Sequence, residues 1–211
     1  MDPMNQSCKQ FVQELSSPNP TPGGGGACAL VGAAGAALGH MMGSLAIGKP
    51  RYAAAQEELT RLCAQTQQVQ QALLALAERD EEAFAPLSAA YKMPAGTDEE
   101  KAAKDAALQS ALIEATEVPL EIMRQCAAAI GLIQEFALKG SVMALSDAGV
   151  GALFCRAALT GASLSVFANT RMMADREKAD SLEKEAHRLL GRWEGEAERI
   201  ARYVADSLQD Y

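Results

Sequence analysis

Apolar residues recur every three or four positions along most of the chain, and the longest such pattern runs through about residues 51–92. This spacing places side chains on one face of a helix, so it predicts a long helix that buries one stripe. Strict alternation of apolar and polar residues is nearly absent, and we therefore expect essentially no sheet. The stripe consists of Leu59, Leu62, Thr66, Val69, Leu73, Leu76, Asp80, Phe84 and Leu87.

Helix starts and breakers divide the rest of the chain. Thr97 and Glu100 match a capping box, which indicates a helix start, and Pro119 is expected to kink or interrupt that helix. The expected helices cover about residues 5–15, 26–47, 51–92, 97–138, 146–173 and 176–208. We predict an all-α fold, a single-domain helical bundle over residues 1–211 with a long central helix.

The second expected helix contains an uncharged run from Ala27 to Ile47, with glycine at every fourth position in its middle. Such spacing lets helices approach closely, and it occurs in membrane helices as well as in protein cores. The run is rich in Ala and Gly rather than Leu and Ile, and the adjoining helices are amphipathic. We therefore expect no membrane partner, but a central helix buried all round, packed closely through Gly35, Gly39 and Gly43.

Composition narrows the possible functions. The 211 residues carry a formal net charge of −8 and contain no basic block, which argues against nucleic acid as a partner. No basic segment followed by an apolar one opens the chain, so we expect no signal peptide and a cytoplasmic location. The cysteines are odd in number and form no C-x-x-C pair, which favours reduced core thiols over a metal site. They are Cys8, Cys28, Cys63, Cys126 and Cys155.

Asp80 interrupts the apolar stripe of the long expected helix. A carboxylate on a core-facing stripe is costly unless it is paired, hydrated or functional. Two interpretations stay open at this point. Asp80 is either a structural acid, bonded to a helix N-terminus or an arginine, or a catalytic group whose pKa is raised by desolvation.

The second expected helix is preceded by two prolines and four consecutive glycines, Gly23, Gly24, Gly25 and Gly26. Glycines are costly to order, so four together indicate a sharp turn or a close approach of the backbone to another group. The free N–H groups of the following helix would point at the same place, which suits an anionic or polar ligand. The alternative is a flexible connector.

Asp147 stands near the start of the fifth expected helix, where an aspartate is most often an N-cap. Binding of a ligand is the alternative role. The helix that follows carries an apolar stripe, which we expect to face the core. Its members are Val150, Phe154, Ala157, Gly161, Leu164 and Ala168.

Ser165 and Asn169 lie four positions apart on this helix, so their side chains share a face. Neighbouring basic residues could meet an anionic part of a ligand, or they could simply belong to the solvated surface. The basic residues nearest to these motifs are Lys49, Arg51 and Arg171.

Four segments, taken in order, resemble the formiminotransferase–cyclodeaminase C-terminal domain family, which includes free-standing methenyltetrahydrofolate cyclohydrolases. They are PTPGGGG…GKPRY, ERDEEAFAPLSAAYKMP, ATEVPLEI and KGSVMALSDAGVGALFCRAALTGASLSVFANTRMMAD. The resemblance implies an all-α homodimer with a folate site at or near the dimer interface. It also implies opening or closing of the one-carbon bridge between N5 and N10 of tetrahydrofolate, without metal or redox cofactor.

Within this resemblance, Asp80 matches the catalytic aspartate of a D-x-x-A-F motif, and Gly23 to Gly25 match a P-G-G-G-S loop. From their chemistry and position rather than from the resemblance, Asp147 or Asn169 could hold the pterin, and Lys49, Arg51 or Arg171 could meet the glutamate tail. The chain has smaller residues where the family usually carries Ser, Asn and Asn. These are Gly26, Ser141 and Ser165.

Two functional hypotheses follow. The first is a folate one-carbon enzyme, either a methenyltetrahydrofolate cyclohydrolase or a formiminotetrahydrofolate cyclodeaminase. The second is a catalytically degenerate helical dimer that keeps the fold and at most binds a folate-like ligand. Retention of Asp80 favours the enzyme, whereas the three smaller residues favour the degenerate relative.

Overall fold

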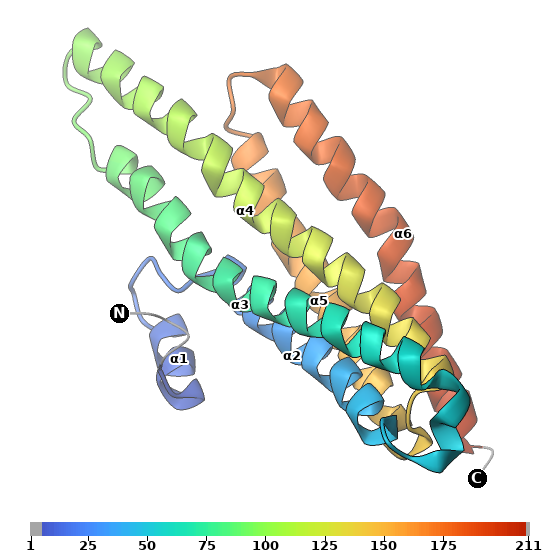
Figure 1. Ribbon diagram of the computed structural model, residues 1–211. Helices are drawn as coiled ribbons and strands as arrows, with labels where there is room; N and C mark the ends of the chain where they lie inside the picture. The colour runs from blue at the N-terminus through green and yellow to red at the C-terminus, as the bar shows by residue number, and fades with distance from the viewer. Residues whose placement is uncertain (1–5, 210–211) are drawn as a thin grey trace.

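The computed structural model describes residues 6–209, which form helices and connecting turns without a strand. Figure 1 shows long, roughly aligned helices, with the short α1 standing beside them. The all-α prediction is confirmed. The α-helices are α1 (Cys8–Leu15), α2 (Gly24–Ala46), α3 (Gln56–Tyr91), α4 (Asp98–Lys139), α5 (Leu145–Thr170) and α6 (Arg176–Gln209), and two 3₁₀ turns, η1 (Pro50–Ala55) and η2 (Val142–Ala144), precede α3 and α5.

Helix ends follow local chemistry. The capping box of Thr97 and Glu100 is present at the start of α4, as predicted. Ser7 and Gln10 form a second box at α1, while Asn5, where this helix was expected to begin, lies outside the described residues. The predicted helix from residue 51 is instead η1 followed by α3.

Pro119 does not interrupt α4, which runs unbroken through it. A proline inside a helix removes one backbone N–H, so the carbonyl four residues earlier loses its usual partner. In a buried helix that carbonyl needs another donor. In α4 the carbonyl concerned is that of Ala115, and its new partner belongs to the candidate site described below.

Helix α2 packs against α3, α4 and α5 through notches at its glycines. A Cβ atom built on Gly35 would lie 2.7 Å from the carbonyl oxygen of Gly151 in α5. One built on Gly39 would lie 2.7 Å from Cγ1 of Ile133 in α4. The predicted close contact is confirmed, and these contacts are made with different helices of the same chain.

The cysteine prediction is largely confirmed. Cys63, Cys126 and Cys155 are buried free thiols, Cys28 is partly buried, and Cys8 is exposed. The buried sulfurs occupy glycine notches of α2. A Cβ on Gly32 would lie 2.8 Å from Cys126 Sγ, and one on Gly35 would lie 2.6 Å from Cys155 Sγ. Within residues 6–209, no group of three or more His, Cys, Asp or Glu side chains is arranged to hold a metal ion.

Two sequence expectations about burial are wrong. Helix α2 is not buried all round, because Val31, Met41 and Leu45 remain exposed on one side. The expected core stripe of α5 also faces outward, with Phe154 and Leu164 exposed. The inward stripe of α5 is built mostly from smaller residues, which let the helices approach closely: Ala148, Ala152, Cys155, Leu159, Ala162 and Val166.

Helix α2 and the segment Val142–Thr170 are each long and apolar enough to cross a bilayer by length and composition alone. In each of these segments, 44% of an apolar 18-residue stretch is buried inside the protein. The buried half of α2 contacts α3 and α4, the buried half of α5 contacts α4 and α6, and the two helices also pack against each other. The outward half forms an apolar surface, which we call the α2/α5 face. It comprises Val31, Met41, Leu45, Val150, Leu153, Phe154 and Leu164.

Candidate functional site

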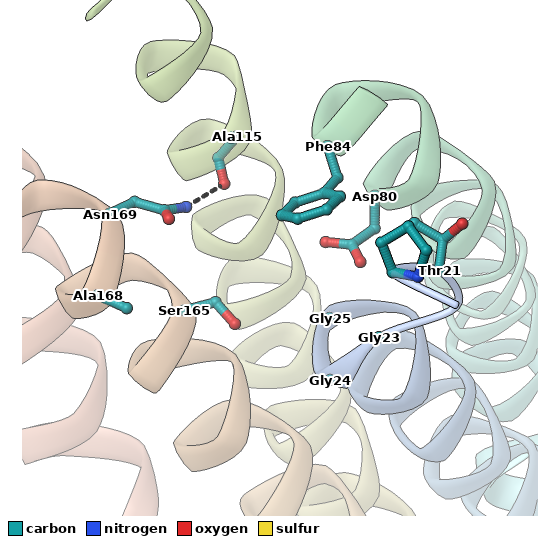
Figure 2. A pocket seen from close by; sticks show the side chains of 11 residues that line it. Thr21, Gly23, Gly24, Gly25, Asp80, Phe84, Ala115, Ser165, Ala168 and Asn169 are labelled. Atoms are coloured by element: carbon teal, nitrogen blue, oxygen red, sulfur yellow. Dashed lines mark hydrogen bonds between the residues drawn. The ribbon is translucent and has the colours of Figure 1, made fainter. Parts of the chain in front are cut away.

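A cavity of about 270 Å³ lies where the start of α2 meets the middle parts of α3 and α4 and the end of α5. Figure 2 shows the carboxylate of Asp80 on one side of it and the side chains of Ser165 and Asn169 on the other. The sequence candidates Gly23, Gly24 and Gly25 also line it. The full lining is Pro20, Thr21, Gly23, Gly24, Gly25, Asp80, Phe84, Ala115, Ser165, Ala168 and Asn169.

The glycine turn and Asp80 fit together closely. The backbone N–H of Gly26 donates to Oδ2 of Asp80 at 2.9 Å. A Cβ atom built on Gly25 would lie only 2.1 Å from Oδ1 of Asp80, so any side chain there would displace the carboxylate. Asp80 therefore bonds a helix N-terminus, as the structural interpretation states, and it also borders a cavity, while its catalytic role stays a prediction.

Burial raises the pKa of Asp80 above its ordinary value, and the hydrogen bond from the Gly26 N–H only partly opposes this rise. The thiol of Cys28 reports the same environment. Its pKa is raised to about 11, first by burial and second by the negative charge of Asp80. A carboxyl group held this way can take up and release a proton closer to neutral pH than an exposed aspartate.

Phe84 lies one turn after Asp80 on α3 and lines the same cavity. Figure 2 shows its ring beside the Asp80 carboxylate. A flat aromatic ring at a cavity wall suits stacking against a planar ligand. The apolar spacing of the sequence places Phe84 only in the core stripe. The signal that could have identified it is its four-residue spacing from Asp80, which places both side chains on one face.

Asn169 is held by the main chain of α4. Its Nδ2 donates to the carbonyl oxygen of Ala115 at 2.7 Å, as the dashed line in Figure 2 marks. Because a carbonyl only accepts hydrogen bonds, this contact fixes which end of the amide faces Ala115. Ser165, one turn earlier on α5, lines the cavity beside it.

The other predicted site residues lie apart from the cavity in this chain. Lys49 and Arg51 follow the far end of α2, whose 23 residues span about 34 Å at 1.5 Å per residue. Asp147 lies at the far end of α5, and it is not an N-cap, since Ala144 holds that position without a side-chain bond. Arg171 directly follows α5 and is exposed, outside the lining.

The three positions with smaller residues differ in location. Gly26 supports Asp80 through its N–H, and a Cβ there would meet only ordinary contacts, the nearest at 3.7 Å. Ser165 lies in the cavity wall. Ser141 is buried at the opposite end of the bundle, where its N–H donates to the carbonyl of Met42 at 3.1 Å. The three positions therefore do not surround one cavity within a single chain.

Comparison with known proteins gives this geometry a context. The sequence profile of the formiminotransferase-cyclodeaminase family matches residues 7–188. A methenyltetrahydrofolate cyclohydrolase of Methylorubrum extorquens is 40% identical over 196 residues, which cover 93% of this chain and 94% of that protein. The mouse formimidoyltransferase-cyclodeaminase is 31% identical over 98% of this chain, which spans 37% of the mouse protein.

A solved structure shows the same fold. The crystal structure of formiminotetrahydrofolate cyclodeaminase from Thermotoga maritima superposes with a TM-score of 0.86 at 26% sequence identity. The match covers 97% of this chain and 98% of the Thermotoga chain. The chain therefore belongs to the formiminotransferase-cyclodeaminase family.

Proposed function

We propose that this protein is a folate one-carbon enzyme that hydrolyses the methenyl bridge of 5,10-methenyltetrahydrofolate. The observation that carries the proposal is the partly buried carboxylate of Asp80 at a cavity wall, beside the ring of Phe84. The substrate has a cationic N5–C–N10 bridge attached to a planar pterin. A carboxylate stabilises such a cation, and an aromatic ring stacks on the pterin.

The carboxylate of Asp80 can transfer protons during the reaction. Water adds to the bridge carbon, a C–O bond forms, and Asp80 takes one proton from the water. The C–N5 bond then breaks, and Asp80 returns the proton to N5. Loss of the remaining hydroxyl proton leaves a formyl group on N10. The reaction changes no oxidation state, so it requires no redox cofactor.

A second candidate reaction is cyclodeamination of formiminotetrahydrofolate. The fold shared with the Thermotoga cyclodeaminase supports it. In that reaction N10 attacks the formimino carbon and ammonia leaves, which again requires one proton to be removed and another delivered. The 40% identity to a cyclohydrolase over nearly the whole of both chains favours the hydrolysis.

The test is a spectroscopic assay of the purified protein. Consumption of methenyltetrahydrofolate above the uncatalysed rate supports the cyclohydrolase, and release of ammonia from formiminotetrahydrofolate identifies the cyclodeaminase. Binding of either folate without turnover identifies the degenerate relative. In that case Gly26→Ser and Ser165→Asn are the changes expected to restore activity, because both positions adjoin the cavity or its supporting turn.

We further propose that a second copy of the chain covers the α2/α5 face. Gly24 and Ala168 line the cavity and are exposed, one at the start of α2 and the other near the end of α5, the two helices that carry this face. In a twofold dimer with antiparallel α2 helices, Lys49 and Arg51 of one copy would lie near the glycine turn of the other. Their positive charge would then meet the anionic tail of the folate.

The dimer is tested by a matched pair of variants. Leu164→Asp places a charge on the α2/α5 face. Leu138→Asp places a charge outside this face at a similarly exposed site, because Leu138 is 64% exposed and Leu164 is 67% exposed. Sedimentation should show a dimer for the wild type and Leu138→Asp, and a monomer for Leu164→Asp. A wild type that is monomeric at all concentrations, or that requires detergent to stay in solution, contradicts the proposal.

Mixing two inactive variants tests whether the site is shared. If Arg51 serves the partner's cavity, Asp80→Asn and Arg51→Ala subunits form mixed dimers in which one site is intact. Activity then returns on mixing and subunit exchange. If Arg51 and Asp80 act within one chain, no activity returns beyond the sum of the two separate proteins. If Arg51 has no role, Arg51→Ala is active by itself.

A further inference from the structure

Pro119 removes a backbone donor at the point where Asn169 needs an acceptor. In an ordinary helix the N–H of residue 119 would donate to the carbonyl of Ala115, four residues earlier. Proline has no N–H, and its ring pushes that carbonyl away from the helix axis. Ala115 and Pro119 are both buried, so the carbonyl of Ala115 needs a replacement donor. The replacement is the Nδ2 of Asn169, at 2.7 Å.

This bond determines what Asn169 presents to the cavity. With its nitrogen committed to Ala115, the side chain offers Oδ1, for which residues 6–209 supply no hydrogen-bond partner. Asn169 lines the cavity, and Figure 2 shows the oxygen turned away from Ala115. The cavity wall therefore carries a fixed acceptor opposite Asp80.

We propose that Pro119 is a positioning residue that orients Asn169, so that the site selects ligands with an N–H donor at this wall. The inference rests on the proposed function, since the pterin ring carries such donors. Pro119 does not touch the ligand. It acts through the carbonyl of Ala115, which it leaves free to accept the hydrogen bond from Asn169 of α5.

The first experiment needs no ligand. The side-chain amide of Asn169 gives a pair of NMR signals, which are assigned by their loss in Asn169→Ala. In the wild type these protons should be protected from exchange with solvent. In Pro119→Ala the restored N–H of residue 119 takes the Ala115 carbonyl, and the protection should be lost. An unprotected Asn169 amide in the wild type overturns the proposal even if the variant fails to fold.

The second experiment measures binding of 5-formyltetrahydrofolate by calorimetry to the whole protein. Pro119→Ala should raise the Kd about tenfold, the effect of one lost hydrogen bond. Asn169→Ala should raise it similarly, and the double variant should be no weaker than Asn169→Ala alone, because both changes remove one interaction. Additive losses would mean that the two residues act separately, and they would overturn the proposal.

A control and a kinetic readout separate positioning from a general effect on the helix. Pro86 also lies inside a helix, α3, but it is exposed and borders no part of this cavity. Pro86→Ala should leave both the Asn169 signals and the Kd unchanged. If the enzyme turns over, Pro119→Ala should raise KM about tenfold with little change in kcat, since the amide holds the ligand in ground and transition states alike.

The outcomes distinguish this inference from the proposed function. If the wild type binds no folate, the proposed function is wrong, while the NMR signals of Asn169 still decide whether Pro119 orients it. If the wild type binds folate and Pro119→Ala leaves both the signals and the Kd unchanged, only the positioning role is wrong.

Discussion

Replacing Asp80 by Asn keeps the shape of the site and removes its charge. The amide oxygen of the new side chain can still accept the hydrogen bond from the Gly26 N–H, which is 2.9 Å from Oδ2 in the wild type. The turn at Gly25 should therefore keep its geometry. What the variant loses is the ability to stabilise a cationic bridge and to carry a proton.

The expected loss in kcat is about 10²–10⁴-fold, the range for a positioned general acid or base. At about 1.36 kcal/mol for each factor of ten, this corresponds to roughly 3–5 kcal/mol of lost transition-state stabilisation. Asp80→Ala should lose activity and stability together. It leaves the Gly26 N–H without its acceptor, which costs about 1.5–3 kcal/mol for a bond to a charged group.

Stability should respond to pH with a definite sign. Burial raises the pKa of Asp80 in the folded protein above its value in the unfolded chain. The folded state therefore holds its proton more tightly, and stability from this group declines as pH rises through the folded pKa. In thermal unfolding, the stability of Asp80→Asn relative to the wild type should increase from acidic to neutral pH.

The assay measures turnover of the wild type and of Asp80→Asn over the same pH range as the thermal unfolding. Wild-type kcat/KM should rise with pH through the pKa of Asp80, because the base must be ionised, and this limb should be missing from the residual activity of Asp80→Asn. A variant with full turnover per folded molecule would show that Asp80 only caps α2. In that case the cavity would lack the acid–base group that the proposed mechanism requires.

Gly25→Ala should reduce activity at least tenfold, because its Cβ would meet Asp80 Oδ1 at 2.1 Å. Gly26→Ala is the control and should stay folded, since its nearest contact lies at 3.7 Å. Equal effects of the two variants in activity assays would refute this reasoning. Gly39→Leu should destabilise the protein by about 1–3 kcal/mol in denaturant titration, since even a Cβ there lies 2.7 Å from Ile133, and an unchanged midpoint would show that α2 is less tightly packed. Turnover should survive exhaustive chelation, because Asp80 supplies the acid–base chemistry, and loss with EDTA that zinc reverses would contradict the proposed site.

Much of the fold follows from local pattern. The spacing of apolar residues and the Thr97 capping box locate the helices to within a few residues, because these signals act over one or two turns. The exposed stripe of α5 could not be predicted in the same way. Phe154 and Leu164 look like core residues by spacing, and only the arrangement of neighbouring helices decides which apolar stripe is covered within one chain.

The site was predictable where one residue broke a pattern. Asp80 stands out because a charge interrupts an apolar stripe, and the glycine turn stands out by composition. Phe84 and Thr21 interrupt no pattern in the sequence around them, so they do not stand out in this way. The distant positions of Lys49 and Asp147 follow from helix length, since residues at opposite ends of α2 and α5 cannot meet in one cavity of the same chain.

The buried thiols that lie against the glycines of α2 allow the packing of this helix to be followed by chemical labelling. Burial raises the pKa of Cys155 to about 12 and that of Cys126 well above its ordinary value, so neither reacts while α2 is in place. Cys8 is exposed and should be labelled at once. The slower labelling of Cys126 and Cys155 then measures how often α2 separates from α4 and α5, and a bound folate that contacts the glycine turn should slow it further.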